Sequence, residues 1–346
     1  KILELALNDG FDPRTKKQVG PKTGDPATFK TFEDMYAAFE KQLQYCEEVL
    51  RRGAWIASML AAEYLPVTWR SVLTNGCIES GVDVWNGGAN YYTVAQISVG
   101  QVDAGNGLMA IKDQIYDKKK LTWAELKVAL AANFEGEYER VHKMLYVDAP
   151  KYGNNIREAD MMVRRVNDSI LNAFNNVDGG GNYLGRDTLY RTSLDQYTKS
   201  IHNLMGKVTG ALPNGKKAGQ ALTDGSLSAM PGTDVNGPTA LVMSASMAGD
   251  PIRWTATHMN MKVQPDQLKS RKGRDQVLGI VKTLFDNGGY HIQFNCLDTE
   301  MLRDAQKHPE KYRDLVVRVA GFSAFFTKLD VGVQNEVIER TLQTFH

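Results

Sequence analysis

The chain has 346 residues, of which 42% are hydrophobic and 23% are charged, the composition of an ordinary globular protein. Its 41 basic and 40 acidic residues leave a net charge of +1, which predicts neither a nucleic-acid partner nor binding to an anionic membrane. No run of about 18 apolar residues is present, which excludes a transmembrane helix. Cys46, Cys77 and Cys296 lie too far apart for a disulfide framework or a zinc site. We therefore expect a cytoplasmic protein.

Residues 1–10 have the pattern of a short helix that stops at a glycine, Gly10. They do not begin with methionine, and they have neither the charged flank nor the cleavage site of a signal peptide. We interpret them as the tail of a helix whose start lies upstream. The expectation is a chain that is a fragment, or one piece, of a larger polypeptide.

The first half of the chain reads as a series of helices. Apolar residues of 32–64 recur every three or four positions, which predicts one long amphipathic helix. Thr122 and Glu125 have the spacing of a capping box at the start of a helix. The other helices are expected at 67–80, 108–116, 122–134, 138–145 and 154–175, before a glycine-rich break at 178–185.

The second half mixes loops, short strands and helices. Residues 206–238 are dense in Gly, Pro, Asn and Asp, which predicts a long loop of the kind that usually carries function. Short β-like runs are expected at 239–263, 289–297 and 315–319, and helices at 276–286, 299–307 and 331–344. This alternation predicts α/β architecture.

Several common site motifs are absent from the sequence. Gly179, Gly181 and Gly185 have the wrong spacing for a dinucleotide fingerprint, and no P-loop is present. The six histidines have no metal-ligand spacing, and there is no G-x-S-x-G elbow. We therefore expect no metal site and no bound nucleotide.

The most informative motif lies near the C-terminus, where residues 318–322 read R-V-A-G-F. A lone glycine at this place is compatible with a tight turn that needs a positive φ at Gly321. The whole stretch 318–326, however, resembles the radical-bearing loop of the glycyl radical enzymes, whose signature is R-V-[AS]-G-[FY]. The flanking segments 305–317 and 334–341 are similar to the same family.

The resemblance covers essentially all of the chain. N-G-C-I-E-S-G-V-D and the G-G-A-N-Y that follows it are similar to a family stretch that reads C-I-E-x-G-x-D and then G-G-A-x-Y. Three further matches follow in the family order: A-P-K-Y-G-N at 149–154, T-G-A-L-P-N-G-K-K-A-G at 209–219 and N-G-P-T at 236–239. The chain is identified by this resemblance as the C-terminal portion of a pyruvate formate-lyase-like glycyl radical enzyme.

The resemblance implies that Gly321 stores a radical after an S-adenosylmethionine-dependent activating enzyme removes one α-hydrogen. Such a radical spreads onto the amide nitrogen and the carbonyl when the centre is planar, and a side chain would crowd that planarity. Arg318, Phe322 and Phe325 are expected to pack around the loop and keep it dry. No other cofactor is expected.

The resemblance also implies a fold and a division of the chain. The fold class is α/β, the C-terminal half of a ten-stranded barrel with the Gly321 loop inserted in its centre. We expect half-barrel residues at 1–288 and a glycine radical domain at 289–346. Half a barrel leaves open strand edges, so the missing N-terminal part is expected as a partner. A homo-oligomer or a complex with small subunits is also expected.

In the family the radical passes from the glycine to a cysteine thiol, often within a C-x-E motif. Cys77 and Glu79 imitate that motif, but their flanks match the later C-I-E-x-G-x-D element. Cys296 lies in an apolar run and is a weaker candidate. The catalytic cysteine is therefore expected upstream of this chain.

Candidate substrate-pocket residues are Trp85, Asn86, His202 and Met259. Large apolar side chains suit a hydrocarbon substrate, because a hydrocarbon binds through buried apolar area alone. The interpretation therefore leans towards addition of a hydrocarbon to fumarate, the reaction of the alkyl- and benzylsuccinate synthases. Packing of Trp85 and the methionines as ordinary core is equally compatible with the sequence. A glycyl radical eliminase or dehydratase is the nearest alternative, and an arylacetate decarboxylase is another. A non-catalytic radical-domain rescue protein is an alternative of another class, but the family elements at 70–240 argue against it.

Overall fold

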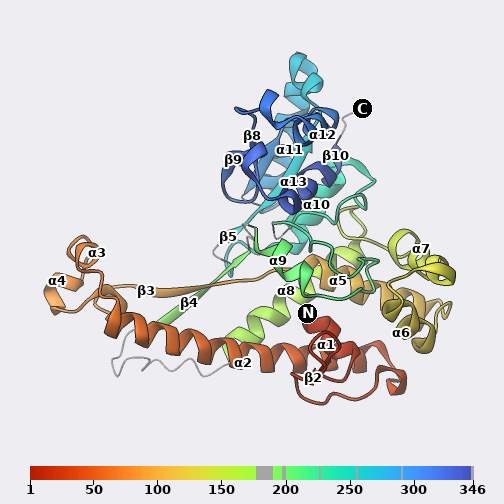
Figure 1. Cartoon of the computed structure of the whole chain (residues 1–346), viewed down its shortest axis with the longest axis horizontal. Helices are drawn as coiled ribbons and strands as arrows, with labels where there is room; N and C mark the ends of the chain where they lie inside the picture. The colour runs from red at the N-terminus through yellow and green to blue at the C-terminus, as the bar shows by residue number, and fades with distance from the viewer. Residues whose placement is uncertain (177–189, 197–199, 226, 255, 290, 344–346) are drawn as a thin grey trace.

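The computed structural model describes residues 1–176, 190–196, 200–225, 227–254, 256–289 and 291–343. Helices form a central body, from which the end of one long helix and two extended strands project to one side (Figure 1). The C-terminal elements gather at the opposite end from the long helix (Figure 1). Within the described ranges, no helix is long and apolar enough to cross a membrane. The predicted glycine-rich break at 178–185 lies outside the described residues.

The long helix α2 (Phe32–Tyr64) has the predicted bounds. It begins at a capping box, in which Thr31 Oγ1 accepts from the Asp34 N–H at 3.3 Å and Asp34 Oδ2 accepts from the Thr31 N–H at 2.8 Å. Its first half buries Met35 and Phe39 against the helical body. The predicted apolar stripe is therefore covered only in part, because Val49 and Leu50 in the second half are exposed.

The helical body surrounds α5 (Gln101–Ile111) and α8 (Arg157–Asn176), which pack against one another and form much of the first hydrophobic core. The capping box predicted at Thr122 and Glu125 is confirmed at the start of α6 (Trp123–Ala131). Smaller elements complete this half: α1 (Ile2–Leu7), β1 (Phe11–Asp12), β2 (Lys17–Gln18), α3 (Thr68–Val72), α4 (Cys77–Ser80) and α7 (Glu139–Lys143).

The single helix predicted at 67–80 is wrong, because the chain forms α3 and α4 with a turn between them. Gly76 precedes α4 with a φ of +96°, a left-handed conformation that glycine adopts without strain. A Cβ at this position would lie 2.4 Å from Asn90 Oδ1. The close approach of the 87–90 segment therefore separates the two helices.

The predicted α/β architecture is confirmed by two parallel three-stranded sheets. The first has the order β3 (Tyr92–Ile97), β4 (Tyr190–Gln196) and β5 (Ala256–Thr257), and the second has the order β10 (Leu342–Gln343), β6 (Met259–Val263) and β7 (Ile292–Asn295). Only His258 separates β5 from β6. The stretch 256–263 therefore joins the two sheets.

The short β-like runs predicted within 239–263 are confirmed at its end by β5 and β6, whereas its first part forms the helix α10 (Gly237–Ala248). Pro238 fits the first turn of this helix, where its missing N–H has no partner to lose. The alanine, leucine and methionine residues that follow favour helix over strand. The other elements here are α9 (Ile201–Lys207) and α11 (Arg271–Asp286), and the described residues between α9 and α10 form the predicted long loop.

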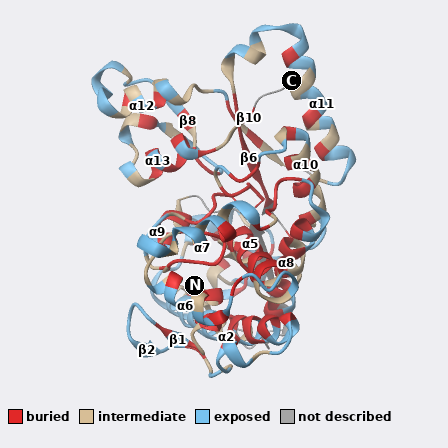
Figure 2. Cartoon of the chain, turned by 90° about the vertical axis from the view of Figure 1, so that its right-hand side faces the viewer, coloured by how far each residue is buried: buried red, intermediate tan, exposed pale blue. Residues whose placement is uncertain are grey.

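The C-terminal elements have a hydrophobic cluster of their own, separate from the two larger cores. Leu302 of α12 (Thr299–Lys307), Val317 of β8 (Val316–Arg318) and Val337 of α13 (Val331–Glu339) are members of this cluster. Figure 2 shows this upper lobe beside α10 and α11 and above the helical body. The final helix ends at Glu339, before the predicted 344, because the chain continues into β10.

The buried carboxyl group of Asp160 in α8 should make the stability of the helical body depend on pH. Its side chain is buried, its Oδ1 accepts from the Gly153 N–H at 3.4 Å, and burial raises its pKa to about 6. Because the folded pKa is above the unfolded value, the protonated acid stabilises the fold at low pH, and this stability is lost as the pH rises through about 6.

We expect Asp160→Asn to melt at a higher temperature than the parent protein at pH 7 and at a similar temperature at pH 4. At pH 7 the variant removes a buried charge, whereas at pH 4 both side chains are mostly neutral. Melting followed by circular dichroism between these pH values measures the difference. A difference that stays constant across the pH range would contradict the assignment.

Candidate functional site

Gly321 lies in the turn of a β-hairpin made by β8 and β9 (Ser323–Phe325). The strands pair antiparallel with Arg318 opposite Ser323, and the Val319 N–H donates to the Phe322 carbonyl at 3.0 Å. Gly321 has a φ of +80°, the left-handed conformation expected from the sequence. Val319 and Ala320 are fully buried, whereas Gly321 itself is exposed on the described chain. The hairpin therefore presents the bare glycine at its tip.

The hairpin rests on polar side chains of two neighbouring parallel strands. Asn260 of β6 is opposite Gln293 of β7, and Lys262 is opposite Asn295. Alternate residues of a strand share one face, so these four side chains form a polar grid on one face of the sheet. All four are buried.

Each member of the polar grid reaches the hairpin or the end of α13. Asn295 brackets Arg318, because its Nδ2 donates to the Arg318 carbonyl at 2.7 Å and its Oδ1 accepts from the Arg318 N–H at 2.8 Å. Asn260 Nδ2 donates to the Val319 carbonyl at 3.2 Å, and Lys262 Nζ donates to the Ile338 carbonyl at 2.8 Å. The grid thus fixes the backbone immediately before Gly321.

The fourth member of the grid, Gln293, contacts Gly321 directly. Gln293 Oε1 accepts from the Gly321 N–H at 3.3 Å and from Arg318 Nε at 2.7 Å. Gln293 Nε2 lies 3.1 Å from His291 Nε2. Burial, with the nearby Arg318 charge, lowers the pKa of His291 and so favours its neutral ring, whose Nε2 accepts this hydrogen bond when the proton is on Nδ1.

A buried charge cluster, which Asn260 of the grid contacts through Asp224, also holds the hairpin. Arg340, at the end of α13, donates through Nη1 to the Arg318 carbonyl at 3.0 Å and through Nη2 to the Val319 carbonyl at 2.6 Å. Its guanidinium pairs with Glu336 at 2.7 Å and with Asp224 at 3.2 Å. A buried arginine with two carboxylates and two carbonyls is well satisfied.

The two carboxylates of the cluster titrate differently. Burial raises the pKa of Asp224. Burial, the largest single influence, also acts to raise that of Glu336, but the charge of Arg340 and the contacts with His202 and Arg340 together outweigh it and hold the Glu336 pKa below its usual value. Glu336 also makes two hydrogen bonds with Arg340, at 2.7 and 3.1 Å, so it is the principal counter-ion of the arginine.

Of the side chains expected to pack around Gly321, Arg318 contacts the hairpin and its support, whereas Phe322 and Phe325 are not covered by the described residues. Phe322 and Phe325 are 38% and 49% exposed, so the described residues do not enclose them. Phe326, which follows β9, is fully buried in the C-terminal cluster. Side chains alternate across a strand, so Phe325 and Phe326 cannot both enter the same core.

The four predicted pocket residues do not meet in one place. Trp85 and Asn86 lie in the short turn Val84–Asn86, near α3 at the projecting end of α2 (Figure 1), and Arg70 lies over the Trp85 ring at 5.6 Å. Met259 is buried in β6 within the second hydrophobic core. Grouping these residues into a single pocket is therefore wrong for the described chain.

His202 belongs to the surroundings of the charge cluster. Its ring is fully buried, and its Nε2 lies 3.6 Å from Glu336 Oε2 and 3.0 Å from Asn203 Nδ2. His202 and Arg340 therefore both contact Glu336 of α13. His202 thus contacts the charge cluster that holds the hairpin.

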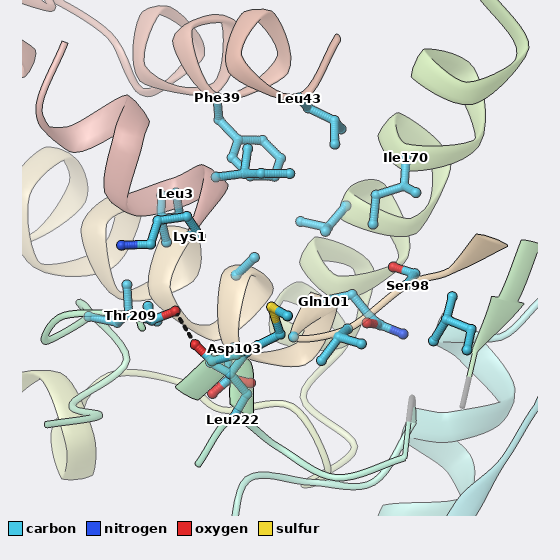
Figure 3. Close-up of a pocket in the computed structure, with 18 of the residues that line it drawn as sticks. Lys1, Leu3, Phe39, Leu43, Ser98, Gln101, Asp103, Ile170, Thr209 and Leu222 are labelled. Atoms are coloured by element: carbon cyan, nitrogen blue, oxygen red, sulfur yellow. Dashed lines mark hydrogen bonds between the residues drawn. The ribbon is translucent and has the colours of Figure 1, made fainter. Parts of the chain in front are cut away.

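Two cavities lie away from Gly321. The first has a volume of about 290 Å³ and is lined mainly by apolar side chains of α1, α2, α5 and α8, with Gln101 and Asp103 on one wall (Figure 3). The second, of about 410 Å³, lies between α13 and residues 216–223 and is more polar. Gly321 and Gln293 line neither cavity, so neither is assigned to the radical chemistry.

Cys77, the cysteine of the C-x-E sequence, is part of a capped helix start. It is buried in α4, and its N–H donates to the Thr74 carbonyl at 3.2 Å. Glu79 Oε2 accepts from the Gly76 N–H at 2.9 Å and so caps the start of the same helix. Cys296 follows β7 and is exposed. Within the described residues, no group of three metal-ligating side chains occurs.

We expect Cys77→Ser to lower the free energy of unfolding by roughly 1 kcal/mol or more, because a hydroxyl replaces a buried thiol. Turnover of the activated protein should persist, with Cys77→Ala as the matched apolar control. Urea unfolding and an anaerobic turnover assay measure the two effects. Complete loss of turnover with the stored radical intact would instead identify Cys77 as the thiyl residue.

The sequence singles out Gly321 and Arg318 as candidates but does not predict the polar grid or the charge cluster. A local signal for the grid exists, because Asn260 and Lys262 alternate with apolar residues in one strand and Gln293 and Asn295 in the next. Polar residues on one face of a buried strand need partners. Their partners, however, lie in the hairpin and α13, which no local pattern connects to these strands.

Comparison with known families is consistent with this geometry. Residues 1–200 match the pyruvate formate lyase-like family, and residues 223–327, which include Gly321 and the polar grid, match the glycine radical domain. The chain belongs to the pyruvate formate lyase-like family of glycyl radical proteins.

Relatives similar in sequence and structure are named for different activities, among them dehydration and decarboxylation. The chain is 39% identical over its whole length to trans-4-hydroxy-L-proline dehydratase of Clostridioides difficile, and 35% identical over 99% of its length to indoleacetate decarboxylase of Tractidigestivibacter scatoligenes. The structure of glycerol dehydratase from Clostridium butyricum superposes with a TM-score of 0.92 at 36% identity over 99% of the chain. The chain spans 42%, 40% and 42% of these three proteins, respectively.

Proposed function

We propose that the protein containing this chain is a glycyl radical dehydratase, a lyase that eliminates water from a small hydroxylated substrate. The observation that carries the proposal is the 39% identity to trans-4-hydroxy-L-proline dehydratase across the whole chain, together with a glycine radical domain whose signature glycine lies at a hairpin tip. Structures of a glycerol dehydratase and of a protein studied for 1,2-propanediol dehydration are similar at TM-scores of 0.92 and 0.91.

In this proposal Gly321 stores the radical. A radical S-adenosylmethionine activating enzyme removes one α-hydrogen from Gly321, and the polar grid and Arg340 hold the backbone on its N-terminal side. The radical then passes to a cysteine thiol outside this chain, and the thiyl takes a hydrogen atom from the substrate. In this proposal Cys77, which is buried at the start of α4, has a structural role and is not that cysteine.

The proposed architecture places this chain in the C-terminal half of a glycyl radical enzyme barrel of ten strands. The joined parallel sheets supply strands of that half, and the exposed Gly321, Phe322 and Phe325 would face its interior. The separate C-terminal hydrophobic cluster supports a division into residues 1–288 and 289–346. A remaining N-terminal part would then cover the exposed hairpin face.

An arylacetate decarboxylase is the second candidate, because indoleacetate decarboxylase is 35% identical over 99% of the chain. The comparisons favour these elimination and decarboxylation reactions over the hydrocarbon addition to which the large apolar residues pointed. Trp85 no longer supports that addition, because its ring packs beneath Arg70 at a distance from the hairpin's supports. The elements shared over the whole chain also argue against a rescue protein that carries only the terminal loop.

The test is anaerobic turnover of the complete protein after activation by a radical S-adenosylmethionine enzyme. The panel contains trans-4-hydroxy-L-proline, glycerol and 1,2-propanediol, then indoleacetate, and finally toluene with fumarate. A dehydration product is the expected result, and Gly321→Ala is the control for radical dependence. Product from indoleacetate alone would favour the decarboxylase. Product from toluene and fumarate alone would overturn both elimination proposals.

A further inference from the structure

Gln293 stands out because one oxygen atom serves two donors at the radical site. Its Oε1 accepts from the Gly321 N–H and from Arg318 Nε, and the side chain is only 7% exposed. This carboxamide is the one side chain among the described hydrogen bonds that accepts from the amide of the radical-bearing residue itself. It therefore differs from Asn295, Asn260 and Arg340, which contact the backbone before Gly321.

The orientation of the Gln293 amide is determined by its neighbours. Arg318 Nε and the Gly321 N–H are both donors, so the oxygen must face them. On the opposite side, the NH2 group lies 3.1 Å from His291 Nε2, which accepts its hydrogen bond when the ring proton is on Nδ1. A flipped amide would place NH2 against two donors, so these two donors specify the orientation of the amide and the hydrogen bond to Gly321.

This hydrogen bond acts on the atom that shares the radical. In a glycyl radical the amide nitrogen donates electron density into the half-filled orbital on Cα. An acceptor on the N–H makes that nitrogen a better donor, and a fixed peptide plane keeps the two orbitals aligned. We propose that Gln293 is a positioning residue that sets the spin distribution and the lifetime of the Gly321 radical, an inference that rests on the proposed radical function.

The polar grid explains why this arrangement is rigid. Asn295 holds both backbone groups of Arg318, and Arg340 and Asn260 hold the Val319 carbonyl. With these anchors the Gly321 amide cannot turn away from Gln293 without breaking several buried hydrogen bonds. Loss of the Gln293 oxygen should therefore leave the loop in place while removing the acceptor.

The experiment uses the complete protein, activated anaerobically, with electron paramagnetic resonance as the readout. Gln293→Met keeps the length of the side chain and removes the acceptor, whereas Gln293→Glu keeps an acceptor oxygen and makes it anionic. Gln306→Met on α12 is the matched control, because Gln306 contacts Gln334 and Asn335 and not the hairpin. Splitting by the α-hydrogen and the amide nitrogen is compared per spin, together with the anaerobic decay rate.

We expect Gln293→Met to change the α-hydrogen splitting and to shorten the radical lifetime by about fivefold, the effect of losing one ordinary hydrogen bond. Gln293→Glu should move the splitting in the opposite direction, and Gln306→Met should match the parent. A purely structural role would lower the yield of radical without changing the splitting per spin.

An unchanged splitting in Gln293→Met overturns the inference. If that variant does not fold or accept a radical, an unchanged splitting in Gln293→Glu overturns it instead. Absence of any radical in the parent protein contradicts the proposed function. Failure of the proposed function and failure of this inference are thus distinguishable.

Discussion

Gly321→Ala should give no glycyl-type doublet and no turnover after anaerobic activation, whereas the parent protein gives both. The methyl group crowds the planar centre, and alanine also carries a strain of about 1 kcal/mol at a φ of +80°. Gly279→Ala in α11 is the matched control, because a Cβ there has open space and no positive φ is required. Electron paramagnetic resonance and product analysis measure the outcome.

The same assignment is tested by oxygen. A radical at Gly321 captures dioxygen directly, and the backbone breaks at that residue. Activated parent protein exposed to air should therefore yield a C-terminal piece that begins near Phe322, and Gly321→Ala should yield none. Mass spectrometry identifies the cleavage point. Cleavage at another glycine, or a doublet in the alanine variant, would refute Gly321 as the radical site.

Among single substitutions in residues 299–343, Arg340→Met should cause the largest loss in the free energy of unfolding. The methionine leaves Asp224 and Glu336 buried without their counter-ion and removes two hydrogen bonds to the hairpin backbone. Breaking a buried ion pair in this way typically costs about 3–5 kcal/mol. Urea unfolding of the parent and variant proteins, followed by circular dichroism, measures the loss.

Two further variants identify the cause of that loss. Arg313→Met is the surface control, because Arg313 is exposed and should change stability by less than about 0.5 kcal/mol. Adding Asp224→Asn to Arg340→Met should recover part of the stability, because it removes one of the two uncompensated charges. A double variant less stable than Arg340→Met would show that the charge cluster is not responsible.

Elements whose conformation is set by residues close to them in the sequence are predicted well. The bounds of α2 follow from its apolar period and from the box at Thr31 and Asp34, and the positive φ of Gly321 follows from the hairpin turn. The helix α10 is the instructive failure, because its short apolar residues suit a buried strand as well as a buried helix. Its type is decided by packing against α8 and α11.

The supports of Gly321 were not predictable because they come together only in the folded chain. Gln293 lies 28 positions before Gly321, and Asn260 lies 59 positions before Val319. Glu336 and Arg340 have the i, i+4 spacing of an ordinary surface ion pair, and nothing local shows that Asp224 completes a buried cluster. Phe322 and Phe325 illustrate the converse, since aromatic residues beside a functional glycine are not necessarily covered within this chain.

The way α13 is anchored determines what happens to a protein nicked at Gly321. The helix α13, which follows the break, would still be held by packing, because Val333, Val337 and Ile338 belong to a hydrophobic cluster with Leu302 and Val317 from before the break. Lys262 still holds the Ile338 carbonyl, and β10 still pairs with β6. The severed piece would therefore remain as a non-covalent complement under native conditions and separate only on denaturation. Exchange of a damaged piece for an intact one would require this whole lobe to open.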